Sequence, residues 1–319
     1  MDYLESADVH DNSKKLYNSK LNEWVGFMPQ FYQSIMCIIT FPDFALQRLE
    51  ASLKTNTPTN RHIYIVAVLS FLRHKCDTLV HLTHEQYAVL RLKWVDMNNV
   101  NEAPIIQRRL ENKPTDMQLK KSGVAITYTE LVTKRDELPI GSIERLLIAM
   151  YTMIPPVRAD YFATEIVHDD TIPTEKNYIR IRNNTAECIL TDFKTVKQYK
   201  QITHTFPPEL VAELLASLEK TPRTYLFINA NGKSHTRNSF TLWSRRALTR
   251  ILGKEFTLVF FRHAFVSNFI DTHNVMTMSD AEVKLISDKM GHSPEMFRAY
   301  KWVHQGKQGE LNLEDASDE

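Results

Sequence analysis

The second half of the sequence carries isolated cations and one tyrosine at positions far apart along the chain. Arg158 follows a Pro-Pro pair at the expected start of a helix, Lys194 stands in a polar turn between two strand-like runs, and Arg262 lies within an apolar helix. His292 follows a Met-Gly pair, and Tyr300 comes eight residues later. An arginine in apolar surroundings is costly unless it is paired with an anion. Arg262 therefore requires an anionic partner, either a bound group or a carboxylate of the chain.

Several other chemistries are excluded by motifs that the sequence lacks. It contains no G-x-G-x-x-G or G-x-x-x-x-G-K-[ST] loop, and only 8 of its 319 residues are glycine. There is no G-x-S-x-G segment, and the histidines form no ligand cluster, so we expect no metal and no cofactor. Cys37, Cys76 and Cys188 stand alone, which excludes a disulfide scaffold and a thiolate zinc site.

The elements that must position these residues form a mixed α/β region. The pattern predicts a helix over about 142–153, ended by the Pro-Pro pair, then strands near 178–182 and 186–190 and a third within 199–205. Helices are expected to follow at about 208–219, 236–251, 260–273, 279–290 and 295–303. Earlier in the chain, we expect a helix from residue 13 and further helices at about 28–39, 43–54, 58–75 and 83–97.

These elements predict a mainly helical α+β protein with a small antiparallel sheet. We expect a disordered N-terminus over 1–12, a helical bundle over 13–97, a linker over 98–123, a catalytic domain over 124–307 and an acidic tail over 308–319. The net charge is +1, but the tail holds five acidic residues and no basic one, so the preceding chain is basic. A basic body is compatible with nucleic-acid binding.

The sequence also favours a protein inside a cell. The longest apolar stretch, over 27–41, is too short and too polar to span a bilayer, and the first residues do not resemble a signal peptide. Unpaired cysteines suit a reducing compartment. We therefore expect an intracellular protein, in the cytoplasm or nucleus of a host cell, with no membrane partner.

Four segments in order resemble the tyrosine recombinases, or phage-type integrases, and the related type IB topoisomerases. They are MYTMIPPVRADYFATEI, ILTDFKTVKQY, FFRHAFVSNFI and MGHSPEMFRAY. They match the family's first arginine, its hairpin lysine, its H-x-x-R helix and its G-H…Tyr segment. The helical region that precedes them resembles the family's core-binding domain. The Pro-Pro pair and the MGHS segment resemble enzymes of large DNA viruses or mobile elements.

The resemblance implies DNA cleavage and rejoining through a 3′-phosphotyrosyl intermediate, without a metal. Arg158 and Arg262 would clamp the scissile phosphate, and His292 would hydrogen-bond it. Tyr300 would attack the phosphorus, and Lys194, on a mobile turn, would protonate the departing 5′-oxygen. Lys197 and Lys200 are possible replacements for Lys194.

One position departs from the family pattern. Val259 occupies the place of the H-x-x-R histidine and can neither transfer a proton nor accept a hydrogen bond. His263 is one residue past Arg262, on another face of the helix, and we interpret it and His304 as structural. The chain contains both arginines, the lysine and the tyrosine of the pattern, which argues against a site that has lost its activity.

The expected partner is double-stranded DNA, gripped by the bundle and the catalytic domain. Arg245, Arg246, Arg250, Lys254 and Lys197 are candidate phosphate contacts. The first interpretation is a site-specific recombinase or integrase that acts as a homotetramer on paired sites. One alternative is a type IB topoisomerase that relaxes supercoils by the same chemistry. A second alternative is a catalytically weakened DNA-binding relative, which only Val259 favours.

Overall fold

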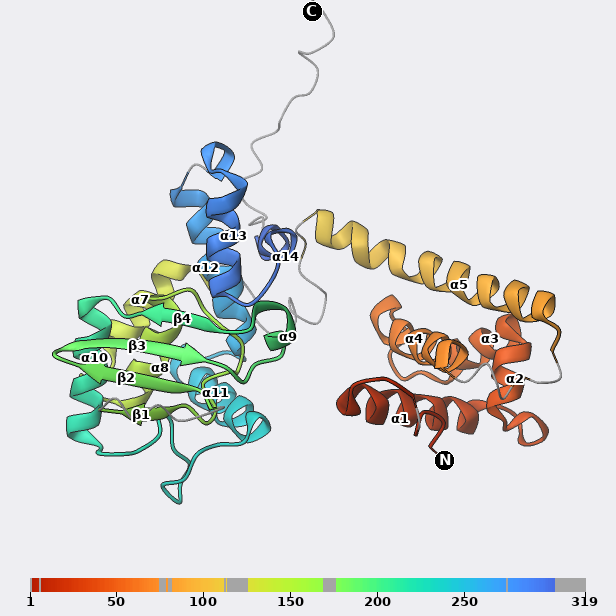
Figure 1. Ribbon diagram of the computed structural model, residues 1–319, viewed down its shortest axis with the longest axis horizontal. Coiled ribbons are helices and arrows are strands. Elements are labelled where there is room, and N and C mark those ends of the chain that lie inside the picture. The colour runs from red at the N-terminus through yellow and green to blue at the C-terminus, as the bar shows by residue number, and fades with distance from the viewer. Residues whose placement is uncertain are drawn as a thin grey trace, which may run out of the picture. The chain divides into compact units, whose positions relative to one another are not determined.

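The computed structural model shows two compact units, Met1–Glu111 and Asn112–Glu319 (Figure 1). It describes residues 2–5, 7–74, 79, 82–111, 113, 126–168, 176–273 and 275–301. Its elements are mostly helices, together with one four-stranded sheet, which confirms the expected α+β class. No described helix combines the length and the apolar character needed to cross a bilayer.

The first unit is a helical bundle around two tryptophans. Its helices are α1 (Asp11–Phe27), the 3-10 turn η1 (Gln30–Tyr32), α2 (Ile35–Thr40), α3 (Pro42–Ser52), α4 (Pro58–His74) and α5 (His84–Leu110). Trp24 and Trp94 are fully buried with ring centroids 5.7 Å apart. Each indole N–H donates to a backbone carbonyl, of Ala45 and Ile39 respectively, so the two rings are fixed as well as buried.

The expected disorder over residues 1–12 is wrong for the part that the structure describes. Leu4 is fully buried in the core of the first unit. The amide N–H groups of Tyr3 and Leu4 both donate to the side-chain oxygen of Asn18, at 2.8 and 3.1 Å. A buried leucine and two long-range hydrogen bonds therefore hold the N-terminus on α1, which itself begins at Asp11 rather than at residue 13.

The linker expected from residue 98 is wrong in its first part, because α5 continues to Leu110. Thr83 and Gln86 form a capping box at its start, and Pro104 lies inside the helix. Asn101 is 5% exposed and bonds to the carbonyl of Pro58 and to Arg61 on α4. These tertiary contacts outweigh the poor helix propensity of this segment. Most of the remaining linker, residues 112 and 114–123, lies outside the described residues.

The second unit packs its helices against a sheet in the order β1-β2-β3-β4 (Figure 1). The strands are β1 (Glu165–Val167), β2 (Tyr178–Arg182), β3 (Thr185–Leu190) and β4 (Ile202–Thr205). The last three are antiparallel, as expected, but β1 pairs parallel with β2, so the sheet is mixed. Asn183 and Asn184 both have positive φ, which suits the tight β2–β3 hairpin.

Helix α8 is the most buried helix described in this unit, since its residues Leu146 to Thr152 are all buried. The helices of the unit are α7 (Tyr128–Glu137), α8 (Ile143–Thr152), α9 (Val196–Tyr199), α10 (Pro208–Lys220), α11 (Arg237–Leu252), α12 (Leu258–Thr272), the 3-10 turn η3 (Val275–Thr277), α13 (Asp280–Lys289) and α14 (Pro294–Ala299). α8 contacts α7, α10, α11 and α12. The sequence pattern missed α7, α9 and β1, while the helix expected at 28–39 is instead η1 and α2.

Candidate active site

Arg262 is fully buried in α12 and has no carboxylate partner among the described residues. Its Nη1 donates to the carbonyl oxygens of Pro156, at 3.0 Å, and Met290, at 2.8 Å. The guanidinium thus joins the Pro-Pro segment to the end of α13. Both carbonyls are neutral, so its positive charge, which the nearby Asp160 offsets only in part, is costly in a buried position.

Three buried nitrogen atoms at this place have no hydrogen-bond partner: Nε and Nη2 of Arg262, and Nε2 of His292. Burial lowers the pKa of the Arg262 guanidinium, Tyr300 opposes this shift, and the charge of Arg158 adds to it. Unpaired buried polar atoms are rare in native proteins and call for an explanation. A bound anion would satisfy the two arginine donors and compensate the charge.

Tyr300 caps the C-terminus of α14 and lies beside these groups. The Arg262 guanidinium carbon is 4.8 Å from the centre of its ring. The His292 ring stacks on it with centroids 5.3 Å apart, and the His263 ring meets it edge-on at 4.8 Å. The structure therefore brings the tyrosine, Arg262 and His292 together.

Both histidines beside Tyr300 are held neutral. Burial, together with the charges of Arg262 and Arg158, lowers the pKa of His292 to about 3. Burial and the charge of Arg262 lower the pKa of His263 to about 4. His292 Nδ1 lies 3.1 Å from the carbonyl oxygen of Ser293, which can only accept, so we assign the proton to Nδ1. Its Nε2 then carries a lone pair that can accept a proton, so the expected hydrogen bond from His292 to a phosphate can form only after the ring has taken up a second proton.

Arg158 lies in the loop between α8 and β1, not at the start of a helix as expected. Its Nη1 donates to the carbonyl of Gly291 at 3.2 Å, and its amide N–H donates to Asp160 Oδ2 at 3.1 Å. Asp160 is 3% exposed and also pairs with Arg237 at 2.5 Å. The arginine loop is thus fixed on one side by Asp160 and on the other by the Gly291–His292 segment.

Lys194 is exposed in the turn that follows β3, and Lys197 is exposed on α9. No hydrogen bond or ion pair joins the Lys194 ammonium to the other candidate residues in the described part of the chain. The backbone around it does reach them, since Thr195 Oγ1 donates to the carbonyl of Gly291 at 3.0 Å. The same carbonyl accepts from Arg158. The Lys194 turn therefore adjoins the arginine loop and the His292 segment.

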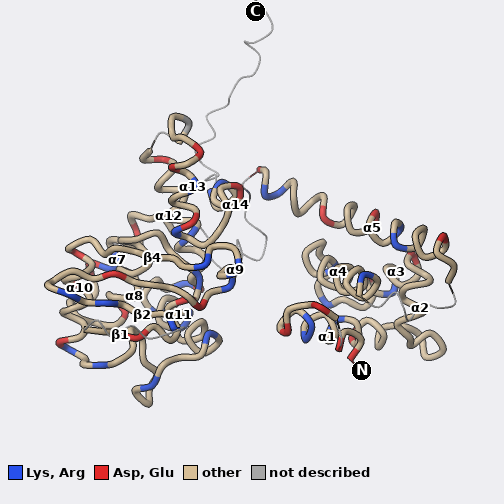
Figure 2. Tube along the Cα trace, viewed as in Figure 1, with Lys and Arg blue, Asp and Glu red and all other residues tan. Residues whose placement is uncertain are grey.

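The candidate DNA contacts Arg245, Arg246 and Arg250 line one open hollow on α11, together with Thr249 and Glu255. Arg245 lies 3.5 Å from Glu255, and Arg250 lies 2.7 Å from Glu144. Lys254 lines a separate hollow beside α7. Figure 2 shows Lys or Arg positions on both α9 and α11. The sequence-predicted cluster is thus a partly neutralised surface, with Lys197 on a different element.

Sequence reasoning missed the position of His263. The pattern indicates a structural residue on another face of the helix, but in the structure its Nδ1 lies 2.9 Å from the carbonyl oxygen of Tyr300. The contact joins residues 37 positions apart, so no local pattern signals it. Val259, at the expected histidine position, is 44% exposed. Among the described residues, no three His, Cys, Asp or Glu side chains are grouped so that they could hold a metal ion.

Comparisons with known proteins found similarity only among solved structures. No protein-family model matches the sequence, and no curated protein is significantly similar to it. The chain is similar to XerA recombinase, with 14% identity and a TM-score of 0.40 over 95% of this chain and 91% of that one. It is also similar to XerH site-specific recombinase bound to difH substrate, with 14% identity and a TM-score of 0.39 over 93% and 88%. Since both TM-scores lie below 0.5, function must be inferred from the site geometry.

Proposed function

We propose that this protein cleaves and rejoins DNA through a covalent link to Tyr300, as a site-specific recombinase. One observation carries the proposal: two unpaired, buried N–H groups of Arg262 and the unpaired Nε2 of His292 lie beside the ring of Tyr300. A phosphodiester is an anion with two non-bridging oxygens, and the arginine fork matches that geometry. The proposed nucleophile therefore lies beside the proposed anion-binding donors.

The proposed reaction begins with the phosphate bound by Arg262 and Arg158. The hydroxyl oxygen of Tyr300 attacks phosphorus and passes its proton to Nε2 of His292, which becomes more basic once the bound phosphate offsets the charges of Arg262 and Arg158 that lower its pKa. The bond from phosphorus to the 5′-oxygen breaks, and the Lys194 ammonium protonates that oxygen. The products are a 3′-phosphotyrosyl link and a free 5′-hydroxyl. Reversal of the same steps rejoins the strand, and the arginines stabilise the charge that develops on the phosphate.

The decisive experiment is adduct trapping on a nicked duplex whose short 5′-fragment diffuses away after cleavage. We expect the wild-type chain to form a covalent protein–DNA adduct that maps to Tyr300. Tyr300→Phe should bind the duplex with unchanged affinity and form no adduct. Tyr199→Phe is the matched control, because Tyr199 is another half-buried tyrosine of the same unit, on α9. A normal adduct yield from Tyr300→Phe would contradict the proposal.

The type IB topoisomerase alternative shares every catalytic group, so a different assay separates the two. Strand exchange between two specific sites supports a recombinase that acts as a tetramer, whereas relaxation of a supercoiled plasmid at high dilution supports the topoisomerase. We propose that neither needs a metal, because the arginines and Lys194 supply the required charge. Cleavage in excess chelator should proceed at the rate seen without it, and loss that magnesium restores would contradict this part.

A further inference from the structure

We propose that Asn177 and Thr195 are positioning residues that hold the Lys194 turn in register with the Arg158 loop and the His292 segment. This inference rests on the function proposed above, in which Lys194 protonates the departing oxygen. It replaces the sequence-based expectation that Lys194 moves with a mobile turn.

Asn177 is the first of the two links. It lies just before β2 and is 4% exposed. Its Oδ1 accepts the amide N–H groups of Thr191 and Asp192, both at 2.8 Å. Its Nδ2 donates to the carbonyl oxygens of Asp160, at 2.8 Å, and Asp192, at 2.9 Å. All four hydrogen-bonding positions of one buried amide therefore tie the Lys194 turn to the loop that carries Arg158.

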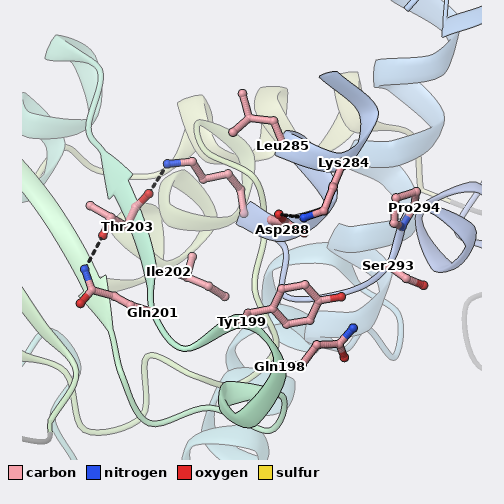
Figure 3. Close-up of a pocket in the computed structure, with 11 residues that line it drawn as sticks. Gln198, Tyr199, Gln201, Ile202, Thr203, Lys284, Leu285, Asp288, Ser293 and Pro294 are labelled. Carbon is pink, nitrogen blue, oxygen red and sulfur yellow. Dashed lines mark hydrogen bonds and ion pairs between the residues drawn. The ribbon is translucent and has the colours of Figure 1, made fainter. Parts of the chain in front are cut away.

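Thr195 is the second link, on the other side of Lys194. Its Oγ1 donates to the carbonyl of Gly291, which also accepts from Arg158. Figure 3 shows the chain that follows this turn, at Tyr199 and Ile202, lining the same pocket as Ser293. The hydrogen bond joins the turn to the segment that contains His292, and the chain that follows the turn shares a pocket of about 600 Å³ with Ser293.

The residues on both sides of Lys194 are anchored while Lys194 itself is exposed. Phe193 is 3% exposed and packs in the core, and Thr195 is bonded as described. The Lys194 Cα is thereby fixed, and only the flexible side chain remains to be placed by substrate. Fixing a reacting group near its target reduces the entropy that must be lost at the transition state. A side chain that fixes this Cα should therefore affect proton delivery specifically.

The test compares two DNA substrates that differ in one atom. In the first, the bridging 5′-atom is oxygen, and in the second it is sulfur, which leaves as a thiolate without needing a proton. Lys194→Ala, Asn177→Ala and Thr195→Val are each assayed for adduct formation. We expect the Asn177 and Thr195 variants to lose about 10²-fold on the oxygen substrate, the typical effect of a small misplacement. On the sulfur substrate all three should recover most of the wild-type rate.

A matched control separates positioning from general damage. Asn229 also organises a turn through its side chain, accepting from the amides of Asn231 and Lys233 and donating to the carbonyl of Ser234. Asn229→Ala should leave the ratio of oxygen to sulfur rates at the wild-type value. Each rate is measured at saturating DNA and alongside a thermal unfolding curve. If Asn177→Ala does not fold, Thr195→Val, which removes one hydroxyl without changing shape, still decides the outcome.

Two results would overturn the inference. Equal loss on both substrates, without sulfur rescue, would mean that Asn177 and Thr195 support the fold of the site as a whole. A Lys194→Ala variant that loses a further 10²-fold when either substitution is added would mean that they act on another group, since residues of one unit are non-additive. If Tyr300→Phe still forms adduct, the proposed function itself is wrong. That experiment does not depend on the ratio of oxygen-substrate to sulfur-substrate rates, so the two failures can be told apart.

Discussion

At the scale of single residues, the buried charge of Arg262 is the feature that most needs a ligand. Its Nη1 is used by two backbone carbonyls, while Nε and Nη2 have no partner. A buried cation without a counterion lowers the stability of the fold. Its retention is explained if the missing anion is the substrate phosphate, which would make the site more stable when occupied.

Arg262→Lys keeps the positive charge, but we still expect it to impair cleavage. A lysine ammonium is a point charge and cannot span the carbonyls of Pro156 and Met290 while presenting a planar fork to phosphate. We expect adduct formation to fall by about 10²–10³-fold, the usual effect of removing one such donor. Arg145→Lys is the matched control, because Arg145 also bonds several backbone carbonyls but on the α7–α8 side of the unit. Wild-type cleavage by Arg262→Lys would contradict the assignment.

At Val259, by contrast, we expect a substitution to preserve or increase the rate of adduct formation. Val259 is 44% exposed and lies one helical turn before Arg262, so an imidazole has room there. The wild-type chain should form measurable adduct without it, because electrostatic stabilisation by the arginines is usually the larger contribution. We expect Val259→His to be neutral or faster, with about 10²–10⁴-fold as the upper bound for added acid–base help. If instead His263→Ala alone abolishes adduct while DNA binding and folding persist, His263 performs the histidine's function.

At the scale of elements, the segment from Met290 to His292 connects the other parts of the site, and we call it the joint. Arg262 bonds its first carbonyl, and Arg158 and Thr195 bond its second. Gly291 has φ +66, and a Cβ there would lie 3.2 Å from Ile202 Cδ1 and 3.4 Å from Thr195 Oγ1. The backbone conformation at this joint therefore favours glycine, and a Cβ would also press on two neighbouring side chains.

Gly291→Ala should displace the joint and reduce adduct formation more than it reduces stability. The left-handed conformation alone costs a non-glycine residue about 1–3 kcal/mol. Gly253→Ala isolates that cost, because Gly253 has φ +69 and no atom within 4 Å of the added Cβ. Both variants should unfold at a lower temperature than wild type, but only Gly291→Ala should cleave slowly. Equal cleavage rates for the two would show that the joint tolerates the methyl group.

At the scale of the whole molecule, three buried histidines make stability depend on pH. Burial lowers the pKa of His204 to about 3, with the charge of Lys289 adding to the shift, and the pKa values of His263 and His292 are lowered to about 4 and about 3. An unfolded histidine titrates near 6.5, so between these values the unfolded chain binds more protons than the folded one. Their contribution to stability is present above pH 6.5 and is lost as pH falls toward 4.

The thermal unfolding midpoint of the second unit should therefore fall steeply below pH 6. Each such histidine contributes a slope of up to about 1.4 kcal/mol per pH unit in this window. His204→Leu removes one of the three, at a buried position whose Nε2 has no partner, and should make the slope shallower. Circular dichroism melts from pH 8 to pH 4.5 measure both. A midpoint that does not change between pH 7 and pH 5 would contradict the neutral assignment.

The sequence by itself determined the fold class and the catalytic candidates. Helical periodicity predicted most helices, and the alternation and double-asparagine turn predicted the β2–β3 hairpin, because these signals are local. Arg158, Arg262, His292 and Tyr300 stood out as residue types in a recognisable order. The sequence misplaced the C-terminal end of α5 and the packing of the N-terminus, where tertiary contacts of Asn101 and Leu4 override local preference.

Only the tertiary structure decided how those candidates are supported. The neutral partners of Arg262, the contact of His263 with Tyr300 and the four hydrogen bonds of Asn177 join residues far apart in the chain. Each contact depends on backbone carbonyl or amide groups. Because nearly all residue types carry these groups, the identity of a residue does not indicate such a contact. The sequence specifies the chemistry of each side chain directly, whereas the backbone groups that orient the side chains reach their positions only when the chain folds.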